Sequence, residues 1–221
     1  MQLSDSFFPS GMFSMSSGLE PLVLDKKITD WTHVLNFITE QIEFQIYPCD
    51  CTVLSIAFSG AKNNDIKTII DIDKKYHSIK LSKEARLSSA RSGKQVLNCV
   101  IHMIEKNDFL NEFDKTIKSN ETPGTYPVIL AISAFFLQIP LDSISRMMLY
   151  SFCSSIVSAA IRLGIIQHLD AQKILTLLSE PINNIISRNN TNDFHDIWQF
   201  TPLTEIYQMN HGKNETRMFI T

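Results

Sequence analysis

The sequence lacks the short motifs that identify the common enzyme classes. Its 221 residues contain no P-loop, no G-x-G-x-x-G turn, no H-E-x-x-H helix and no G-x-S-x-G nucleophile turn. The six histidines are scattered, and no two stand three or four residues apart, as two metal ligands on one helix would. Judged on its chemistry alone, the chain is a domain of unknown role.

Charge is also scarce. Charged residues make up 19% of the chain, below the usual share of about a quarter, and the net charge is −3. A nucleic-acid-binding protein carries a concentrated basic surface, so we predict no nucleic-acid partner. With 44% hydrophobic residues and so few charges, part of the surface is expected to be apolar and to be covered by other proteins.

The four cysteines are too few and too dispersed for a zinc site or a disulfide framework. Cys49 and Cys51 form one C-x-C pair, whereas a structural zinc site needs a second pair or suitably spaced histidines. Cys99 and Cys153 lie in apolar runs and are expected in the core. We therefore predict no metal ligands. The N-terminal residues carry Asp5 and no basic stretch, so a reducing, cytoplasmic location is expected.

No hydrophobic run is long enough for a typical transmembrane helix. The longest uncharged candidate, residues 147–161, has 15 residues between Arg146 and Arg162, whereas a span needs roughly 20. It is also rich in serine. We predict a buried central helix and no membrane partner.

Helical spacing of apolar residues dominates the rest of the chain. The segment 51–58 fits either a strand or a short helix, and no internal repeat is present. The sequence therefore predicts an all-α fold, a single-domain helical bundle (1–221) around one very apolar central helix. The expected helices cover about 30–46, 63–79, 82–113, 128–137, 140–163 and 170–185.

The stretch AAIRLGIIQHLDAQKIL (159–175) brings four charged or titratable residues together after the apolar helix. Gly164 is typical of a residue that ends a helix, and Asp170 is expected to cap the next one. Arg162, Gln167 and His168 would then be displayed on or beside the connecting loop. Two alternatives use this same loop: a helical enzyme and a small-ligand-binding module, each of which needs a concave pocket there.

Four stretches in register suggest a family. They are MQLSDSFFPSGMFSMSSGLE (1–20), ARSGKQVLN with GTYPVILA (90–98 and 124–131), YSFCSSIVSAAIRLGIIQHLDAQKIL (150–175) and PLTEIYQMNHGKNETRMF (202–219). In this order and spacing the chain resembles the urease accessory protein UreF family over nearly its whole length. Some positions depart from the family pattern, among them Ile166, which stands where a glycine is usual.

The resemblance implies a helical, homodimeric urease maturation factor without catalytic activity. Such a protein joins the accessory protein UreD (also called UreH) and recruits or regulates the GTPase UreG, so that nickel is inserted into the urease apoprotein. Nickel and GTP act through these partners, and no cofactor is bound directly.

The resemblance also suggests which residues contact partners. The N-terminal loop (about 1–20) and the C-terminal tail (about 208–221) are expected to be docking segments, together with the loop after the apolar helix. The expected partner-binding residues are Pro9, Phe13, Glu20, Arg162, Gln167, His168, Asp170, Gln172, His211, Arg217 and Phe219.

Overall fold

The computed structural model describes residues 15–188, 194–211 and 218–219, with the side chain of residue 211 excepted. Within these residues every regular element is a helix, which confirms the all-α prediction. The elements are α1 (Leu19–Leu24), α2 (Trp31–Gln41), η3 (Ile42–Cys51), α3 (Thr52–Lys62), α4 (Ile66–Ile79), α5 (Lys83–Met103), α6 (Asp108–Lys118), α7 (Tyr126–Phe136), α8 (Leu141–Arg162), α9 (His168–Ile186), η4 (Phe194–Asp196) and α10 (Pro202–His211).

Local sequence sets several of the helix starts. Asp30, Asp65, Ser82 and Asn107 each accept a hydrogen bond from a backbone N–H in the first turn of the helix that follows. The ambiguous segment 51–58 falls mainly in helix α3. The pattern expected as one helix over 82–113 is two helices. Asn107 is the N-cap of α6, and Lys106 before it has a φ of 50°.

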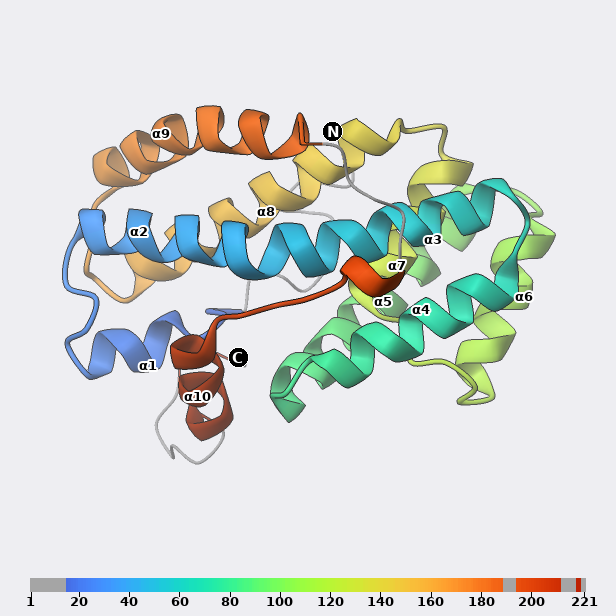
Figure 1. Ribbon diagram of the computed structural model, residues 1–221, viewed down its shortest axis with the longest axis horizontal. Helices are drawn as coiled ribbons and strands as arrows, with labels where there is room; N and C mark the ends of the chain where they lie inside the picture. Colours follow the sequence, from blue (N-terminus) through green and yellow to red (C-terminus); the bar gives the residue numbers. More distant parts are fainter. Residues whose placement is uncertain (1–14, 189–193, 212–217, 220–221) are drawn as a thin grey trace.

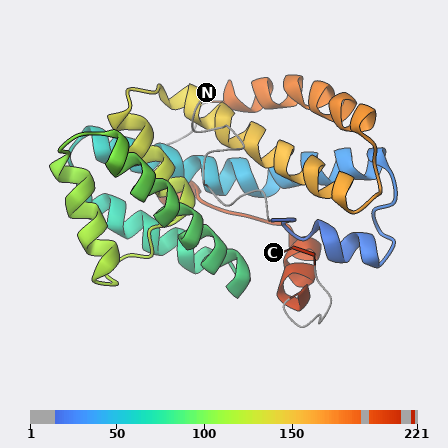
Figure 2. The same cartoon turned by 180° about the vertical axis from the view of Figure 1, so that it is seen from behind.

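The helices form a bundle in which α2, η3 and α3 run end to end as one long rod (Figure 1). Helices α8 and α9 lie side by side along this rod, and α4 to α7 group around its far end (Figures 1 and 2). Helix α10 packs against α1 at the opposite end, beside the C-terminal tail. The N- and C-terminal elements thus meet at one end of the bundle.

Two helices share the centre of the core. Helix α7 is the more completely buried one, because all residues from Tyr126 to Ala134 are buried. Helix α8, expected to be the buried central helix, keeps one exposed face on which Tyr150 is 52% exposed. Of the helices in the described residues, only α8 is long and apolar enough to cross a membrane, and 61% of its most apolar window is buried inside the protein. Such burial is typical of a core helix.

Segment η3 is a π-helix that contains Pro48. In an α-helical register, proline removes the hydrogen bond to the carbonyl four residues earlier, which here is that of Phe44. The Phe200 N–H donates to the Phe44 carbonyl over 2.8 Å, and the Trp198 N–H donates to the Pro48 carbonyl over 3.4 Å. The segment before α10 is therefore fastened to the π-helix by its backbone.

The three fully buried thiols are expected to be unreactive. Cys49, Cys51 and Cys153 are at most 1% exposed, and burial raises the pKa of Cys49 and of Cys153 to about 12 and that of Cys51 well above its usual value. We expect iodoacetamide at pH 8 to label only the half-buried Cys99 in the folded protein and all four cysteines in guanidinium. Mass spectrometry of the labelled protein measures this, and rapid native labelling of Cys49 would contradict it.

The same shifts predict the response to alkali. The folded state favours the neutral thiols, so this contribution to stability is fully present below the unfolded pKa of 9. It is lost as the pH rises from about 9 toward 12. Urea unfolding between pH 8 and pH 11 should therefore show decreasing stability, and a constant midpoint would contradict the assignment.

Candidate functional site

The turn between α8 and α9 is built by the glycine that the sequence indicated. Gly164 has a φ of 76°, a conformation that favours glycine, and its N–H donates to the Ile161 carbonyl over 3.0 Å. The Ile165 N–H donates to the Ala160 carbonyl over 3.2 Å. This pair of bonds is a Schellman motif and confirms Gly164 as the residue after the C-cap.

The prediction that Asp170 is the N-cap of the next helix is wrong by three residues. Helix α9 begins at His168, its N-cap is Gln167, and Asp170 occupies the third helical position. The Asp170 carboxylate accepts a hydrogen bond from the Gln167 N–H over 2.9 Å, and the two residues form a capping box. The error arose because a carboxylate stabilises a helix start both from the cap and from the third position.

Removing this capping interaction should weaken α9 measurably. We expect Asp170→Ala to lower the free energy of unfolding by about 1 kcal/mol, because the Gln167 N–H loses its acceptor. Chemical unfolding followed by circular dichroism measures this. Gln172→Ala, at an exposed site in the same helix, is the control and should change stability by less than about 0.5 kcal/mol. Equal effects of the two substitutions would contradict the capping role.

The residues of the turn lie on the surface of the bundle. Gln167, His168 and Gln172 are exposed, and Arg162 and Asp170 are half-buried. None of these five residues lines either of the two cavities described below.

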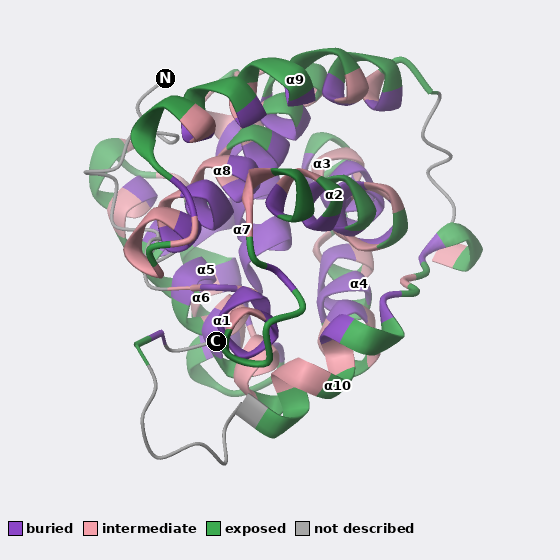
Figure 3. Ribbon diagram, turned by 90° about the vertical axis from the view of Figure 1, so that its left-hand side faces the viewer, coloured by how far each residue is buried: buried purple, intermediate pink, exposed green. Residues whose placement is uncertain are grey.

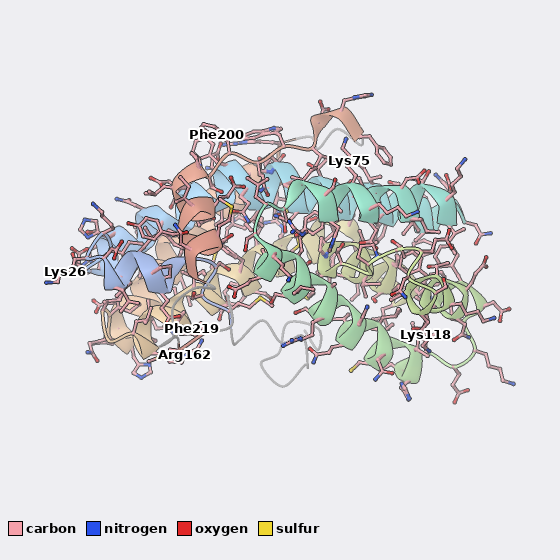
Figure 4. All side chains as sticks on the ribbon, turned by 90° about the horizontal axis from the view of Figure 1, so that it is seen from below. Lys26, Lys75, Lys118, Arg162, Phe200 and Phe219 are labelled. Atoms are coloured by element: carbon pink, nitrogen blue, oxygen red, sulfur yellow. The ribbon has the colours of Figure 1, made fainter. Side chains whose placement is uncertain are left out.

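Arg162, Glu20 and Phe219 come together at the end of α8. Glu20 is buried, and its carboxylate accepts hydrogen bonds from the backbone N–H groups of Met218 (2.6 Å) and Phe219 (3.2 Å). Phe219 is 3% exposed, and the Arg162 guanidinium carbon lies 4.3 Å from the centroid of its ring (Figure 4). Burial lowers the pKa of Arg162 from its ordinary value. We call Glu20, Arg162, Met218 and Phe219 the tail clasp.

The tail clasp changes the interpretation of two predicted docking residues. Glu20 and Phe219 were expected to contact a partner, and here they hold the C-terminal tail against the chain's own α1 and α8. A cation–π contact and two hydrogen bonds to a carboxylate are together worth several kcal/mol at a buried site, on the order of 2–5. The tail therefore shapes this end of the molecule.

Helix α10 closes the same end (Figure 3). The Tyr207 hydroxyl donates to the Asp25 carboxylate over 2.8 Å, and the Gln208 side chain donates to the Ser17 carbonyl over 2.9 Å. Gly18 is required here, because its φ is 90° and a Cβ atom would lie 2.9 Å from a side-chain carbon of Thr204. The predicted N-terminal and C-terminal docking segments thus meet in space where the structure describes them.

Four of the predicted partner-binding groups lie outside the described residues. They are Pro9, Phe13, Arg217 and the side chain of His211, whose backbone ends α10. The predicted contacts of all eleven residues with other proteins remain predictions.

An apolar groove beside α10 was missed by the sequence analysis. It has a volume of about 540 Å³ and lies between α1, α2, η3 and the start of α10. Phe44, Phe200 and Leu203 line it and are 44%, 69% and 57% exposed. The scattered aromatic residues of the sequence did not predict this groove, because it forms only when residues 197–200 bind η3.

Two features bear on metal and small-molecule chemistry. Within the described ranges, no three side chains of the His, Cys, Asp or Glu type are grouped closely enough to hold a metal ion. A buried ion pair, which the sequence did not indicate, joins the Lys80 ammonium to the Asp50 carboxylate over 2.8 Å.

Comparison with known proteins gives one consistent result. The UreF family model matches residues 28–179. The urease accessory protein UreF of Trichodesmium erythraeum is 30% identical over 223 residues, which span 99% of this chain and 94% of that protein. Urease accessory proteins UreF of Yersinia pestis and Yersinia pseudotuberculosis are 28% identical over 219 residues, which span 99% of this chain and 95% of theirs.

Proposed function

The chain belongs to the UreF family of urease accessory proteins, and we propose that it is a non-catalytic maturation factor for urease. In this proposal it joins UreD/UreH, recruits or regulates the GTPase UreG, and presents the assembly to the urease apoprotein for nickel insertion. Nickel and GTP act through the partners. We also propose that the chain works as a homodimer in the cytoplasm.

One observation carries the proposal: the similarity to urease accessory proteins extends over 99% of the chain. It therefore includes α1, α10 and the tail, which lie outside the segment matched by the family model. These are the elements that meet at the tail clasp. An end of the molecule assembled from both termini, with exposed aromatic residues beside it, supports a role in binding other proteins.

The proposal favours a scaffold over an enzyme. Arg162, His168 and Asp170 each have a structural role or an exposed position at the α8–α9 turn. Arg162 stacks on Phe219, Asp170 stabilises a helix start, and His168 is exposed on the first turn of α9. We propose that partner proteins bind the α8–α9 turn and the tail clasp as one continuous surface.

Co-expression tests the proposal. The chain is produced with its cognate UreD/UreH and UreG, purified with GTP and magnesium, and weighed by native mass spectrometry. We expect a complex that contains all three proteins with two copies of this chain. If the chain never co-purifies with either partner, the proposal is wrong.

Three variants separate surface recognition from the tail clasp. Arg162→Ala removes the half-buried cation and its contact with Phe219. Glu20→Ala removes the carboxylate that binds the tail and leaves Arg162 in place. The control is Lys118→Ala, at the far end of the molecule, where Lys118 pairs with Asp114 on its own helix (Figure 4). We expect loss of UreG from the complex with Arg162→Ala and full assembly with Lys118→Ala. Full assembly with all three variants would remove this surface from the proposal.

A further inference from the structure

A small cavity lies under α10, apart from the apolar groove and the α8–α9 turn, and charged and polar side chains form part of its wall. Its volume is about 100 Å³, which corresponds to about three water molecules at roughly 30 Å³ each. Its wall combines residues of η3, α4, α5, α7, α8 and α10 with Ser17 and Lys80 from the connecting segments. A space that so many elements enclose is fixed by the fold as a whole.

The polar wall of this cavity is organised around the buried ion pair. Lys80 is 5% exposed and donates to the Asp50 carboxylate, whose second oxygen accepts from the Tyr76 hydroxyl over 2.6 Å. The Lys80 ammonium also lies 4.8 Å from the Tyr76 ring centroid. Asp50 stands on the π-helical segment η3, and π-helical turns are frequent at functional sites.

Hydrogen-bonding capacity remains unused at the cavity. An ammonium group has three donors, and among the described residues the Lys80 ammonium meets one hydrogen-bond acceptor, the Asp50 carboxylate. Ser88 is 7% exposed and lines the cavity, and its hydroxyl can both donate and accept a hydrogen bond. The Asp50 oxygens accept one bond each and can accept more. The cavity therefore offers both donors and acceptors to a guest.

The charges select against an ionic guest. Lys80 and Asp50 cancel each other, and Glu205 is the further carboxylate whose field reaches Lys80. An anion would add an uncompensated buried charge beside the Asp50 carboxylate, and a cation would face the Lys80 ammonium. A neutral molecule that carries a carbonyl acceptor and an NH₂ group on the same carbon satisfies the wall without adding charge.

We infer that this cavity is a binding site for a small neutral primary amide. The guest carbonyl accepts from the Lys80 ammonium, and its NH₂ group donates to the Asp50 carboxylate and the Ser88 hydroxyl. A guest with about four non-hydrogen atoms, such as acetamide, fills the cavity. Binding is non-covalent and requires no metal or cofactor.

Acetamide and acetate provide a matched test because they share size and shape and differ in charge. The full-length protein is titrated with each and followed by the backbone amide resonances in NMR. We expect saturable shifts with acetamide, confined to residues near 45–50, 76–80 and 85–89, with a dissociation constant in about the millimolar range. Acetate should bind at least about tenfold more weakly.

The outcomes are decisive in both directions. No saturation with acetamide up to about 100 mM would mean that the cavity holds water only, and would overturn the inference. Acetate binding equal to or tighter than acetamide would also overturn it, because the site would then select an anion. Saturable changes of backbone amide resonances that are confined to other parts of the chain would also overturn the inference.

A pair of buried serine variants localises the site. Ser88→Val fills the cavity and removes a hydroxyl, and we expect it to weaken acetamide binding at least about fivefold. Ser155→Val on α8 makes the same change at a buried serine without a hydrogen-bond partner that does not line the cavity, and it should bind acetamide as the parent does. Equal binding by both variants would overturn the inference. If Ser88→Val does not fold, the shift mapping in the parent protein decides.

Discussion

Gly93→Ala is expected to be among the most destabilising single substitutions in the chain. Gly93 lies in α5 where the helix packs on the backbone of residues 124 and 125. A Cβ atom at this position would lie 2.8 Å from the carbonyl carbon of Thr125 and closer still to the carbonyl oxygen of Gly124. Backbone atoms cannot rotate out of the way, so α5 and the loop must separate.

We expect this separation to lower the free energy of unfolding by about 3 kcal/mol or more, or to prevent folding. Urea unfolding followed by circular dichroism measures the change. Lys94→Ala, at the neighbouring exposed position, is the control and should stay within about 0.5 kcal/mol of the parent. A loss of less than about 1 kcal/mol with Gly93→Ala would contradict the packing described here.

Asp73→Asn is expected to have the second large effect. Asp73 is fully buried in α4, and its carboxylate accepts four hydrogen bonds from the loop that precedes α7. The donors are the Thr122 hydroxyl (2.6 Å), the Gly124 N–H (2.7 Å), and the N–H (2.9 Å) and hydroxyl of Thr125. One carboxylate therefore holds the loop against which Gly93 packs.

In the asparagine variant one oxygen becomes an NH₂ group that faces two donors. We expect a loss of about 3 kcal/mol, because buried donors without acceptors cost about 1–3 kcal/mol each and the loop relaxes only in part. Thermal and urea unfolding measure it. Asp71→Asn, at an exposed position of the same helix, removes the same charge and should leave stability nearly unchanged. Equal stability of the two variants would contradict the role of Asp73.

Periodicity and capping chemistry made much of the fold predictable. Apolar spacing identified most helices, and Asp30 and Gly164 marked a helix start and a helix end where the structure has them. These signals are local, since a cap and its helix are separated by a few residues. The break between α5 and α6 was missed because apolar residues continue in helical spacing across it.

The parts that sequence reasoning missed depend on distant contacts. Gly93 lies in the stretch ARSGKQVLN that suggested the family, but its partner, the loop at 124–125, lies about 30 residues away. Glu20 binds backbone groups 198 and 199 positions further along the chain, and the cavity under α10 joins Asp50 to Gln208. No periodic pattern encodes such pairs. Similarly, α7 proved more buried than α8 because neighbouring helices cover all its sides.

The sequence singled out the segments of the candidate site but not how they contact one another. The α8–α9 turn, the N-terminal segment and the tail were each singled out by resemblance to UreF proteins. The structure adds that Arg162, Glu20 and Phe219 share one end of the bundle and that Asp170 has a capping role. The tail was expected to contact a partner, and its residues 218 and 219 contact the chain itself.

The most direct test of the proposed function is the nickel content of urease. The cognate urease subunits and the remaining accessory proteins are produced in nickel-containing medium with this chain, without it, and with Arg162→Ala. Urease is then purified and its nickel measured by inductively coupled plasma mass spectrometry, together with ureolytic activity. We predict nearly full nickel occupancy and activity with the chain, and severe loss of both without it. Equal nickel occupancy in its presence and absence would contradict the assignment as a maturation factor.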